Sequence, residues 1–157
     1  MTIGQILALV GVGIAVILSG MGSSKGVGLA GETAAGVSSE NPEVSSKLLV
    51  LQLLPATQGI YGFLVGIIVL INTGVLGGAM KAVSLEQGIA YIIACLPIGV
   101  VGYYSAIRQA RVASAGMLMT GQRPEMSGKG VTMAVMVETY AVFALLVSFL
   151  MVNAIQL

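Results

Sequence analysis

The sequence from Val131 to Leu146 reads VTMAVMVETYAVFALL, an apolar run that contains one charged residue, Glu138. With its apolar flanks the run is long enough to cross a bilayer, which takes about 20 residues. An ionised carboxylate in hydrocarbon costs several kcal/mol, so proteins keep one there mainly where it binds, relays or pairs with something. We therefore interpret Glu138 as part of an intramembrane ion site. The alternative is an acid buried in a helix bundle against a basic partner.

The composition also indicates a membrane protein. Of the 157 residues, 57% are hydrophobic and only 8% are charged, and 22 are glycines. Such values are typical of chains that span a bilayer. The net charge is +1, there is no histidine and no basic block, so the sequence excludes a nucleic-acid-binding surface. Cys95 has no second thiol with which to pair, and we expect it to be a packing residue.

The apolar residues form four stretches, each long enough to be a spanning helix. They run from about 3 to 31, 47 to 73, 87 to 117 and 128 to 154. Short polar turns containing proline join the first pair and the second pair. The sequence therefore predicts an all-α membrane protein built from two helical hairpins, residues 1–73 and 87–157, with a glycine-rich linker over 74–86.

The two hairpins look like copies of one another. At one constant offset, the turn residues Asn41-Pro42-Glu43 and Lys47 align with Arg123-Pro124-Glu125 and Lys129. The preceding helices match through three pairs of identical residues: Val27 with Val112, Ala30 with Ala115, and Gly31 with Gly116. Internal duplication explains this, with parallel repeats related by an axis along the membrane normal. The second helices then align Ala56 with Glu138, so the first repeat lacks the carboxylate.

The basic residues predict the orientation in the membrane. Six lie toward the two proline turns, and only Lys81 lies on the other side: Lys25, Lys47, Arg108, Arg111, Arg123 and Lys129. Loops rich in lysine and arginine face the cytoplasm. We therefore expect a multi-pass protein of the cell membrane with cytoplasmic turns at 38–46 and 119–127 and with both termini outside.

Small residues recur at helical spacing on the first and third predicted helices. They are Gly20, Ser24, Gly28 and Gly31 on the first, and Gly102, Ala106, Ala110 and Ala113 on the third. Such faces let helix backbones approach closely in lipid. The pattern fits packing within one four-helix bundle, and it equally fits a tight inner ring of helices from many copies.

Depth within a hairpin follows from the distance to the turn, because residues equally far from the turn lie opposite each other. Counted outward from near Arg123, Gln109 and Glu138 are equidistant and should share a level. The same count in the first hairpin places Gln58 close to the corresponding depth. A single glutamine would be explained by interhelical hydrogen bonding, whereas the shared level favours a common site.

Further oxygen atoms are expected at this depth on the second helix. Thr57 and Tyr61 lie within about one turn of each other. Pro55 has no N–H to donate, so the carbonyl of Leu51 is left unbonded, and the kink can loosen neighbouring carbonyls such as that of Leu54. We expect Tyr61 to donate a hydrogen bond to the carboxylate rather than to bind an ion directly.

Together these groups form an oxygen-rich shell around Glu138. Hard cations prefer oxygen ligands of this kind. A pure proton carrier would need only the carboxylate, so we favour Na⁺ as the bound ion, with H⁺ as the alternative because proton sites also use such groups to hold a protonated acid. A salt bridge from Arg108 or Arg111 to Glu138 is the main structural alternative.

Three segments resemble signature sequences of a known family. They are GMGSSKGVG at 20–28, LQLLPATQGIYG at 51–62 and AVMVETYA at 134–141. With the duplicated hairpins and the missing first carboxylate, they resemble the proteolipid (K, or c-type) subunit of V-type and A-type ATPases. The likeness is to the four-helix form found in bacterial sodium-translocating enzymes, and it covers nearly the whole chain.

This resemblance implies a rotor function. In that family many identical copies form a membrane ring that turns in lipid against a stator subunit with an arginine. The cytoplasmic turns meet central-stalk subunits, and a separate soluble head makes or hydrolyses ATP. The roles implied by motif are Glu138 as the ion-binding carboxylate, Gln109, Gln58 and Thr57 as side-chain ligands, Leu54 as a ligand through its backbone carbonyl, and Tyr61 as the hydrogen-bond partner of Glu138. Arg108 departs from the family pattern, which has a small residue there.

The resemblance implies no enzymatic activity in the chain itself and no cofactor beyond the transported ion. The sequence has no Gly-x-x-x-x-Gly-Lys loop, so ATP chemistry does not reside in it. The alternative function is a structural or pore-forming proteolipid ring without ion coupling, which would have no use for a carboxylate surrounded by oxygens. A small secondary transporter, a third possibility, would need a substrate-sized cavity.

Overall fold

The computed structural model describes residues 1–157 and contains four long helical rods and no strand. Its elements are α1 (Ile3–Glu40), η1 (Pro42–Val44), α2 (Ser45–Leu53), η2 (Leu54–Ala56), α3 (Thr57–Asn72), α4 (Leu85–Gln122), η3 (Pro124–Met126) and α5 (Ser127–Ala154). The η elements are short 3₁₀ helices that continue into the α-helices after them. Each rod is long and apolar enough to cross a membrane, which confirms the predicted all-α fold with four spanning helices.

The first helix of each hairpin extends beyond its predicted apolar stretch. α1 continues past Gly31 to Glu40, and α4 continues past Met117 to Gln122. No proline interrupts either extension before the turn. At 1.5 Å per residue, each 38-residue helix is about 57 Å long, against about 30 Å of hydrocarbon. Both helices therefore project beyond the lipid tails.

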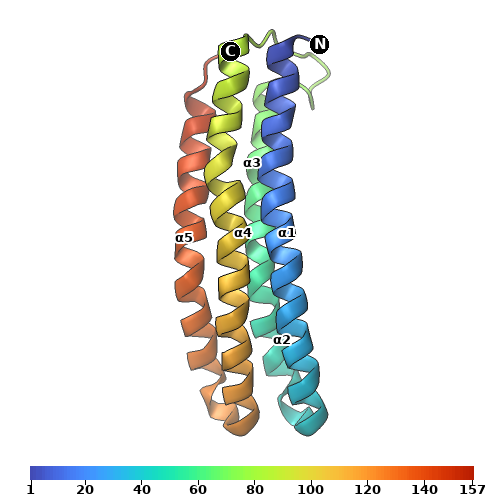
Figure 1. The fold of residues 1–157 in the computed structure, drawn as a ribbon, viewed down its shortest axis with the longest axis vertical. Coiled ribbons are helices and arrows are strands. Elements are labelled where there is room, and N and C mark those ends of the chain that lie inside the picture. The colour runs from blue at the N-terminus through green and yellow to red at the C-terminus, as the bar shows by residue number, and fades with distance from the viewer.

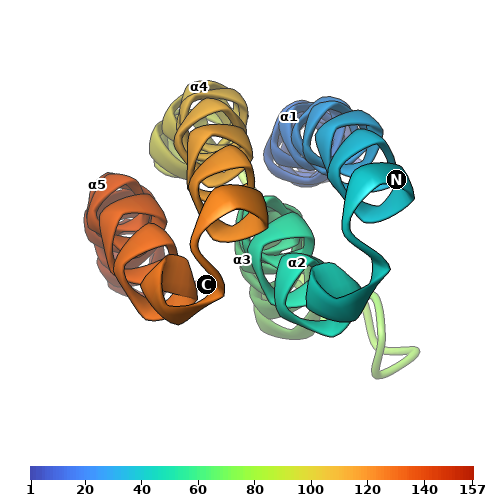
Figure 2. The same cartoon turned by 90° about the horizontal axis from the view of Figure 1, so that it is seen from below.

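The rods form a bundle with both termini at one end and the two proline turns at the other (Figure 1). Viewed along the bundle, α1 and α4 lie side by side in one row, with α2 and α3 behind α1 and α5 beside α4 (Figure 2). The most extensive contact joins α1 to α4. This close approach of the two helices leaves no room for a side chain at Gly22, where a Cβ would lie 2.6 Å from the carbonyl oxygen of Tyr103.

Matching caps show that the two hairpins repeat the same structure. Thr2 caps α1 through a reciprocal pair of hydrogen bonds with Gln5, and Ser84 caps α4 in the same way with Gln87. From Thr2 to Ser84 the offset is 82 residues, and the helix ends, Glu40 and Gln122, are again 82 residues apart. The repeat therefore has one constant offset over the whole hairpin.

This offset corrects the pairing predicted for the first helices. Val27 corresponds to Gln109 and not to Val112, so the predicted alignment was wrong by three residues. A shift of three residues is close to one helical turn, so the wrong alignment still paired residues on the same face of the helix. The turn residues and the second helices were paired at the correct offset.

A glycine ends α3. Gly74 has a left-handed backbone, with φ of 75°, and its N–H donates to the carbonyl of Ile71. The N–H of Val75 donates to the carbonyl of Leu70. These paired bonds close the helix as in a Schellman motif, which places a residue without a Cβ at this position.

Two apolar clusters fill the interior. One, nearer the termini, includes Tyr91, Cys95 and Ile98, and the other, nearer the turns, includes Leu48 and Met117. Cys95 is buried and unpaired, as predicted for a packing residue. Four buried polar residues lie between these clusters: Gln58, Ser105, Gln109 and Glu138.

Candidate ion-binding site

The Glu138 carboxylate is held between α3 and α4 by two neutral donors. Tyr61 on α3 donates its hydroxyl to Oε1 at 2.5 Å, and Gln109 on α4 donates Nε2 to Oε2 at 3.2 Å. Only 9% of Glu138 is exposed. The predicted hydrogen bond from Tyr61 and the predicted shared level of Gln109 and Glu138 are both present.

Gln58 extends this network. Its Nε2 donates to Oε1 of Gln109 at 2.6 Å, and both glutamines are fully buried. Full burial of two amides is favourable only when their polar atoms are paired. The chain from Gln58 through Gln109 to Glu138 therefore crosses the interior from α3 to α5, and it fixes the carboxylate in one place.

Three oxygen atoms gather at the start of α3. The Thr57 hydroxyl donates to the Leu54 carbonyl at 3.0 Å and lies 3.4 Å from Oε1 of Gln58. Pro55 produces this arrangement, because the helix tightens to a 3₁₀ turn at Leu54–Ala56 and the Thr57 N–H bonds the Leu54 carbonyl in place of a normal α-helical donor.

The predicted site residues thus come together in one place. Glu138, Gln109, Gln58, Thr57 and Tyr61 form one chain of hydrogen bonds, to which the Leu54 carbonyl is joined through Thr57. One formal charge sits among neutral oxygens and amides. Such a set can hold a monovalent cation or a proton.

Ser105 belongs to the same network and was not predicted. Its hydroxyl lies 3.4 Å from Nε2 of Gln58 and donates to the carbonyl of Val137 at 3.2 Å. It therefore ties α4 to the turn of α5 just before Glu138. Its position four residues before Gln109 places it on the same helix face, but a serine among small residues gives no distinct signal.

The arginines do not neutralise Glu138. Both carboxylate oxygens accept hydrogen bonds from uncharged groups, and the side chains of Arg108 and Arg111 are exposed. Arg108 lines a groove on the surface between α4 and α5 that includes Val137. The predicted salt-bridge alternative is therefore not what the structure contains.

The site opens toward the outer side of α5. Glu138 lines a shallow hollow of about 190 Å³ together with Val135, Thr139, Val142 and Phe143. This hollow is otherwise almost wholly apolar. The Glu138 residue therefore borders the surface on the side of α5 that faces away from Tyr61 and Gln109.

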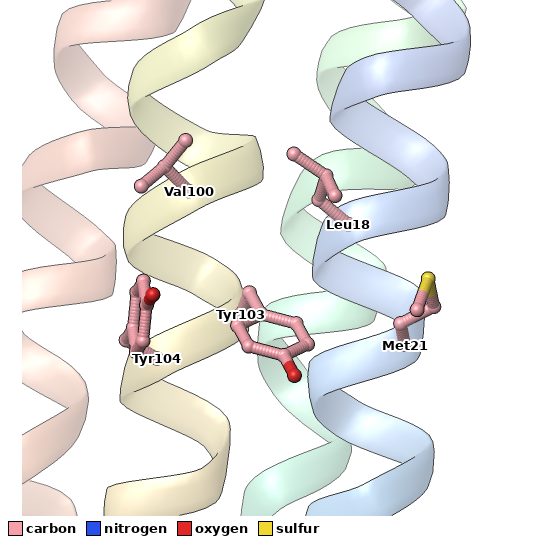
Figure 3. A pocket seen from close by; sticks show the side chains of 5 residues that line it. All are labelled: Leu18, Met21, Val100, Tyr103 and Tyr104. Carbon is pink, nitrogen blue, oxygen red and sulfur yellow. The ribbon is translucent and has the colours of Figure 1, made fainter.

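A second hollow of about 310 Å³ lies between α1 and α4, and it is apolar (Figure 3). Tyr103 and Leu18 point into the space between the helices, with Met21, Val100 and Tyr104 around it. At its edge, Lys25 donates Nζ to the Tyr103 hydroxyl at 2.9 Å. Its lining contains no carboxylate or amide, and it is a different surface from the hollow beside Glu138.

Both hairpins match the family model for the C subunit of ATP synthase, over residues 10–69 and 92–151. The second match begins 82 residues after the first, the offset that the helix caps show. The chain belongs to the ATP synthase C-subunit family. This confirms the resemblance inferred from the motifs and the duplicated hairpin.

Two curated relatives support this assignment. The V-type sodium ATPase subunit K of Enterococcus hirae is 42% identical over 149 residues, which cover 95% of this chain and 92% of the relative. The A-type ATP synthase subunit K of Methanocaldococcus jannaschii is 38% identical over 147 residues, which cover 93% of this chain and 61% of that longer relative.

Proposed function

We propose that this chain is the rotor-ring subunit of a V-type or A-type ATPase and that it carries Na⁺ bound at Glu138. The observation that carries the proposal is the buried carboxylate held by Tyr61 and Gln109 inside an apolar bundle of this family. Gln58, Thr57 and the Leu54 carbonyl supply the remaining ligands. The chain is a non-catalytic subunit, and the ATP chemistry belongs to other subunits.

The charge of the site favours a monovalent cargo. One carboxylate among neutral oxygens becomes electrically neutral when it holds one Na⁺ or one H⁺. A divalent cation would leave a net positive charge in hydrocarbon, which is costly. The name of the Enterococcus hirae relative includes sodium, and this, with the number of neutral oxygens, favours Na⁺ over H⁺.

Sodium binding requires one change in the network. The Gln109 amide presents N–H to Glu138 and its oxygen to Gln58. We propose that the Gln109 and Gln58 amides turn over together when the ion binds. The Gln109 oxygen then faces the cation, the Gln58 oxygen accepts from the Gln109 N–H, and Tyr61 keeps its bond to the other carboxylate oxygen. The oxygens of Leu54 in η2 and Thr57 in α3, already 3.0 Å apart, complete the shell.

The electrical state of Glu138 couples ion movement to rotation. A neutral, occupied site can pass through lipid, whereas a bare carboxylate is tolerated only beside water or an opposite charge. We propose that a stator arginine and an aqueous access path meet the hollow on the outer side of α5. A copy whose ion has left is then held at the stator until another ion binds.

The proposal includes an arrangement in the membrane. We retain the division into hairpins at 1–73 and 87–157, joined by the linker at 74–86, with α1 and α4 lining the inside of the ring of identical copies. The turns at 38–46 and 119–127 face the cytoplasm and meet the central stalk, and the termini are extracytoplasmic. The excess of basic residues toward the turns supports this orientation.

The role of Glu138 is tested in the assembled ATPase with Glu138→Gln. The amide cannot take a charge, so we expect loss of ATP-driven ion transport. Glu125→Gln, at an exposed position in the second turn, is the control and should transport normally. Coupled transport at the unmodified rate in Glu138→Gln would contradict the assignment.

The identity of the ion is tested by carbodiimide labelling of Glu138. A bound cation shields the carboxylate, so Na⁺ should slow the labelling while the same concentration of K⁺ should not. Equal protection by both salts would count against a sodium site. Labelling that neither salt affects, but that low pH promotes, would support the proton alternative.

A further inference from the structure

The internal repeat also indicates how neighbouring copies of the chain contact one another. One operation carries the first hairpin (α1 to α3) onto the second hairpin (α4 and α5) with an offset of 82 residues, and it leaves the helices parallel and side by side (Figure 2). Applied once more, the same operation places another hairpin beside α4 and α5. In a ring this is the first hairpin of the next copy. Each contact between the two hairpins of one chain therefore has a counterpart between the second hairpin of one copy and the first hairpin of the next. We call this interface between copies the seam.

The second hairpin has an open groove where the first hairpin has a filled one. Inside the chain, Gly22 and Gly26 of α1 face α4, and a Cβ at Gly26 would lie 2.8 Å from the Ala106 oxygen. Their counterparts, Tyr104 and Arg108, border an open groove of about 370 Å³ between α4 and α5. Nothing in the chain occupies this groove.

The first hairpin has the matching unpartnered surface. A Cβ at Gly20 or at Gly28 would meet no atom within 4 Å. Their counterparts on α4 are packed, since a Cβ at Gly102 would lie 3.1 Å from Ser19 and Ala110 is fully buried. The face of α1 that includes Gly20 and Gly28 therefore fits the groove of α4 and α5 on another copy.

Two hydrogen bonds join the hairpins at the turn end inside the chain. Asn41 donates Nδ2 to the carbonyl of Gly121 at 3.1 Å, and Lys47 donates Nζ to the carbonyl of Pro124 at 3.1 Å. The donors' counterparts, 82 residues later, are Arg123 and Lys129. The acceptors' counterparts, 82 residues earlier, are Ser39 and Pro42.

Both counterpart donors can make these bonds. Arg123 and Lys129 are long, exposed cations at the turn end. Arg123 has more donors than the asparagine that it replaces, and Lys129 repeats the lysine of the first hairpin. Backbone carbonyls accept from either.

We propose that Arg123 and Lys129 of one copy donate to the backbone carbonyls of Ser39 and Pro42 of the next copy, closing the seam at the turn end while α1 of that copy fills the groove of α4 and α5. This inference depends on the proposed ring. It goes further by naming the surfaces and the hydrogen bonds that join the copies.

At the depth of Arg108, the helices lie further apart at the seam than they do between the two hairpins of one chain. Arg108 stands where the internal contact has Gly26, and its counterpart neighbour on the next copy is Ser24. A guanidinium cannot fit where a single Cβ would already be too close, so the helices must lie further apart there. The seam resembles the contact between the two hairpins most closely at the turn end, because both have hydrogen-bond donors at the same positions.

Cross-linking between introduced cysteines tests the seam. The background is Cys95→Ser, which removes the chain's one cysteine. Ser39→Cys with Arg123→Cys places two thiols that face each other across the seam. Asn41→Cys with Gln122→Cys is the matched control, because these positions border one hollow within the chain.

With a short bismaleimide on purified rings, the seam pair should give a ladder of covalent multimers on a denaturing gel. The control pair should lose its thiols and remain a monomer. If the rings are intact in electron micrographs and the control pair reacts but the seam pair stays monomeric, the seam assignment is overturned while the rotor function stands. If the protein forms no ring at all, both fail.

Discussion

At the scale of single residues, the site consists of one charge and neutral groups that hold it. Glu138 contributes the charge, and Tyr61 and Gln109 fix both of its oxygens. Because the surrounding helices are apolar, water does not compete for these bonds, and each counts for more than it would on a soluble surface.

Removing the Tyr61 hydroxyl should weaken ion binding without removing it. Tyr61→Phe keeps the ring and loses one hydrogen bond to a charged group, which contributes about 1.5 kcal/mol, or about tenfold in affinity. We expect about ten times more Na⁺ to be needed for half-protection of Glu138 from carbodiimide. Tyr140→Phe is the control, because Tyr140 is 67% exposed. Unchanged protection in Tyr61→Phe would remove this residue from the site.

Most of the site could be predicted from the sequence because its members break apolar runs. A carboxylate, two glutamines and a proline stand out among aliphatic residues, and counting from the turn placed Gln109 beside Glu138. Ser105 did not stand out, because serine is common on the small-residue faces of membrane helices. The exposed positions of Arg108 and Arg111 also needed coordinates, since sequence distance places both near the site.

At the scale of the elements, the break at Pro55 presents oxygens to the site. The 3₁₀ turn at Leu54–Ala56 holds the Leu54 carbonyl near the Thr57 hydroxyl. Pro97 lies inside α4 about three turns from Gln109, where the adjacent Ile98 N–H donates to the buried Ser148 hydroxyl.

Straightening this break should impair the site while the fold persists. Pro55→Ala restores an N–H and lets the rod continue as an α-helix, in which the Leu54 carbonyl bonds the N–H of Gln58. We expect a higher Na⁺ requirement for protecting Glu138, with the helix content by circular dichroism kept. Pro97→Ala should leave the requirement unchanged. An equal effect of both substitutions would show that the break at Pro55 has no special role.

The close approach of α1 and α4 should be sensitive to one methyl group. In Gly22→Ala the new Cβ would lie 2.6 Å from a backbone oxygen of Tyr103, which cannot move aside cheaply. We expect a loss of about 1–3 kcal/mol of stability, seen as a lower melting temperature in detergent. Gly36→Ala meets open space and should keep or raise the melting temperature. A Gly22→Ala protein that melts at the unmodified temperature would contradict the packing described here.

The elements themselves were predictable, but their register was not. Proline turns and apolar lengths identified four helices in two hairpins. The offset between the first helices was missed by three residues because small residues recur nearly once per turn. The caps at Thr2 and Ser84 resolve it, since each capping box is formed at one position only.

At the scale of the whole molecule, one repeat accounts for both the fold and the proposed assembly. The proposed ion site needs both hairpins, because α3 supplies Tyr61 and Gln58 while α4 and α5 supply Gln109 and Glu138. The counterpart site across the seam would have Ala56 in place of Glu138 and Val27 in place of Gln109. Each copy should therefore carry one ion. The missing carboxylate at Ala56 was visible in the sequence, whereas the pairing of Val27 with Gln109 needed the offset that the caps give.

The ring should loosen when the seam donors are shortened. Arg123→Gln with Lys129→Gln weakens two hydrogen bonds per copy, each contributing about 1 kcal/mol. We expect the ring to dissociate in dodecyl sulfate at a lower temperature. Lys81→Gln, in the linker at the opposite end, should leave that temperature unchanged. An identical dissociation temperature for both variants would argue against these bonds.

The measurement that tests the central claim most directly is the number of sodium ions bound per chain in purified rings, counted with radioactive sodium. We predict one ion per chain in the unmodified protein and none in Glu138→Gln, with Glu125→Gln still binding one. Sodium retained by Glu138→Gln rings, or two ions per chain in the unmodified protein, would contradict the account.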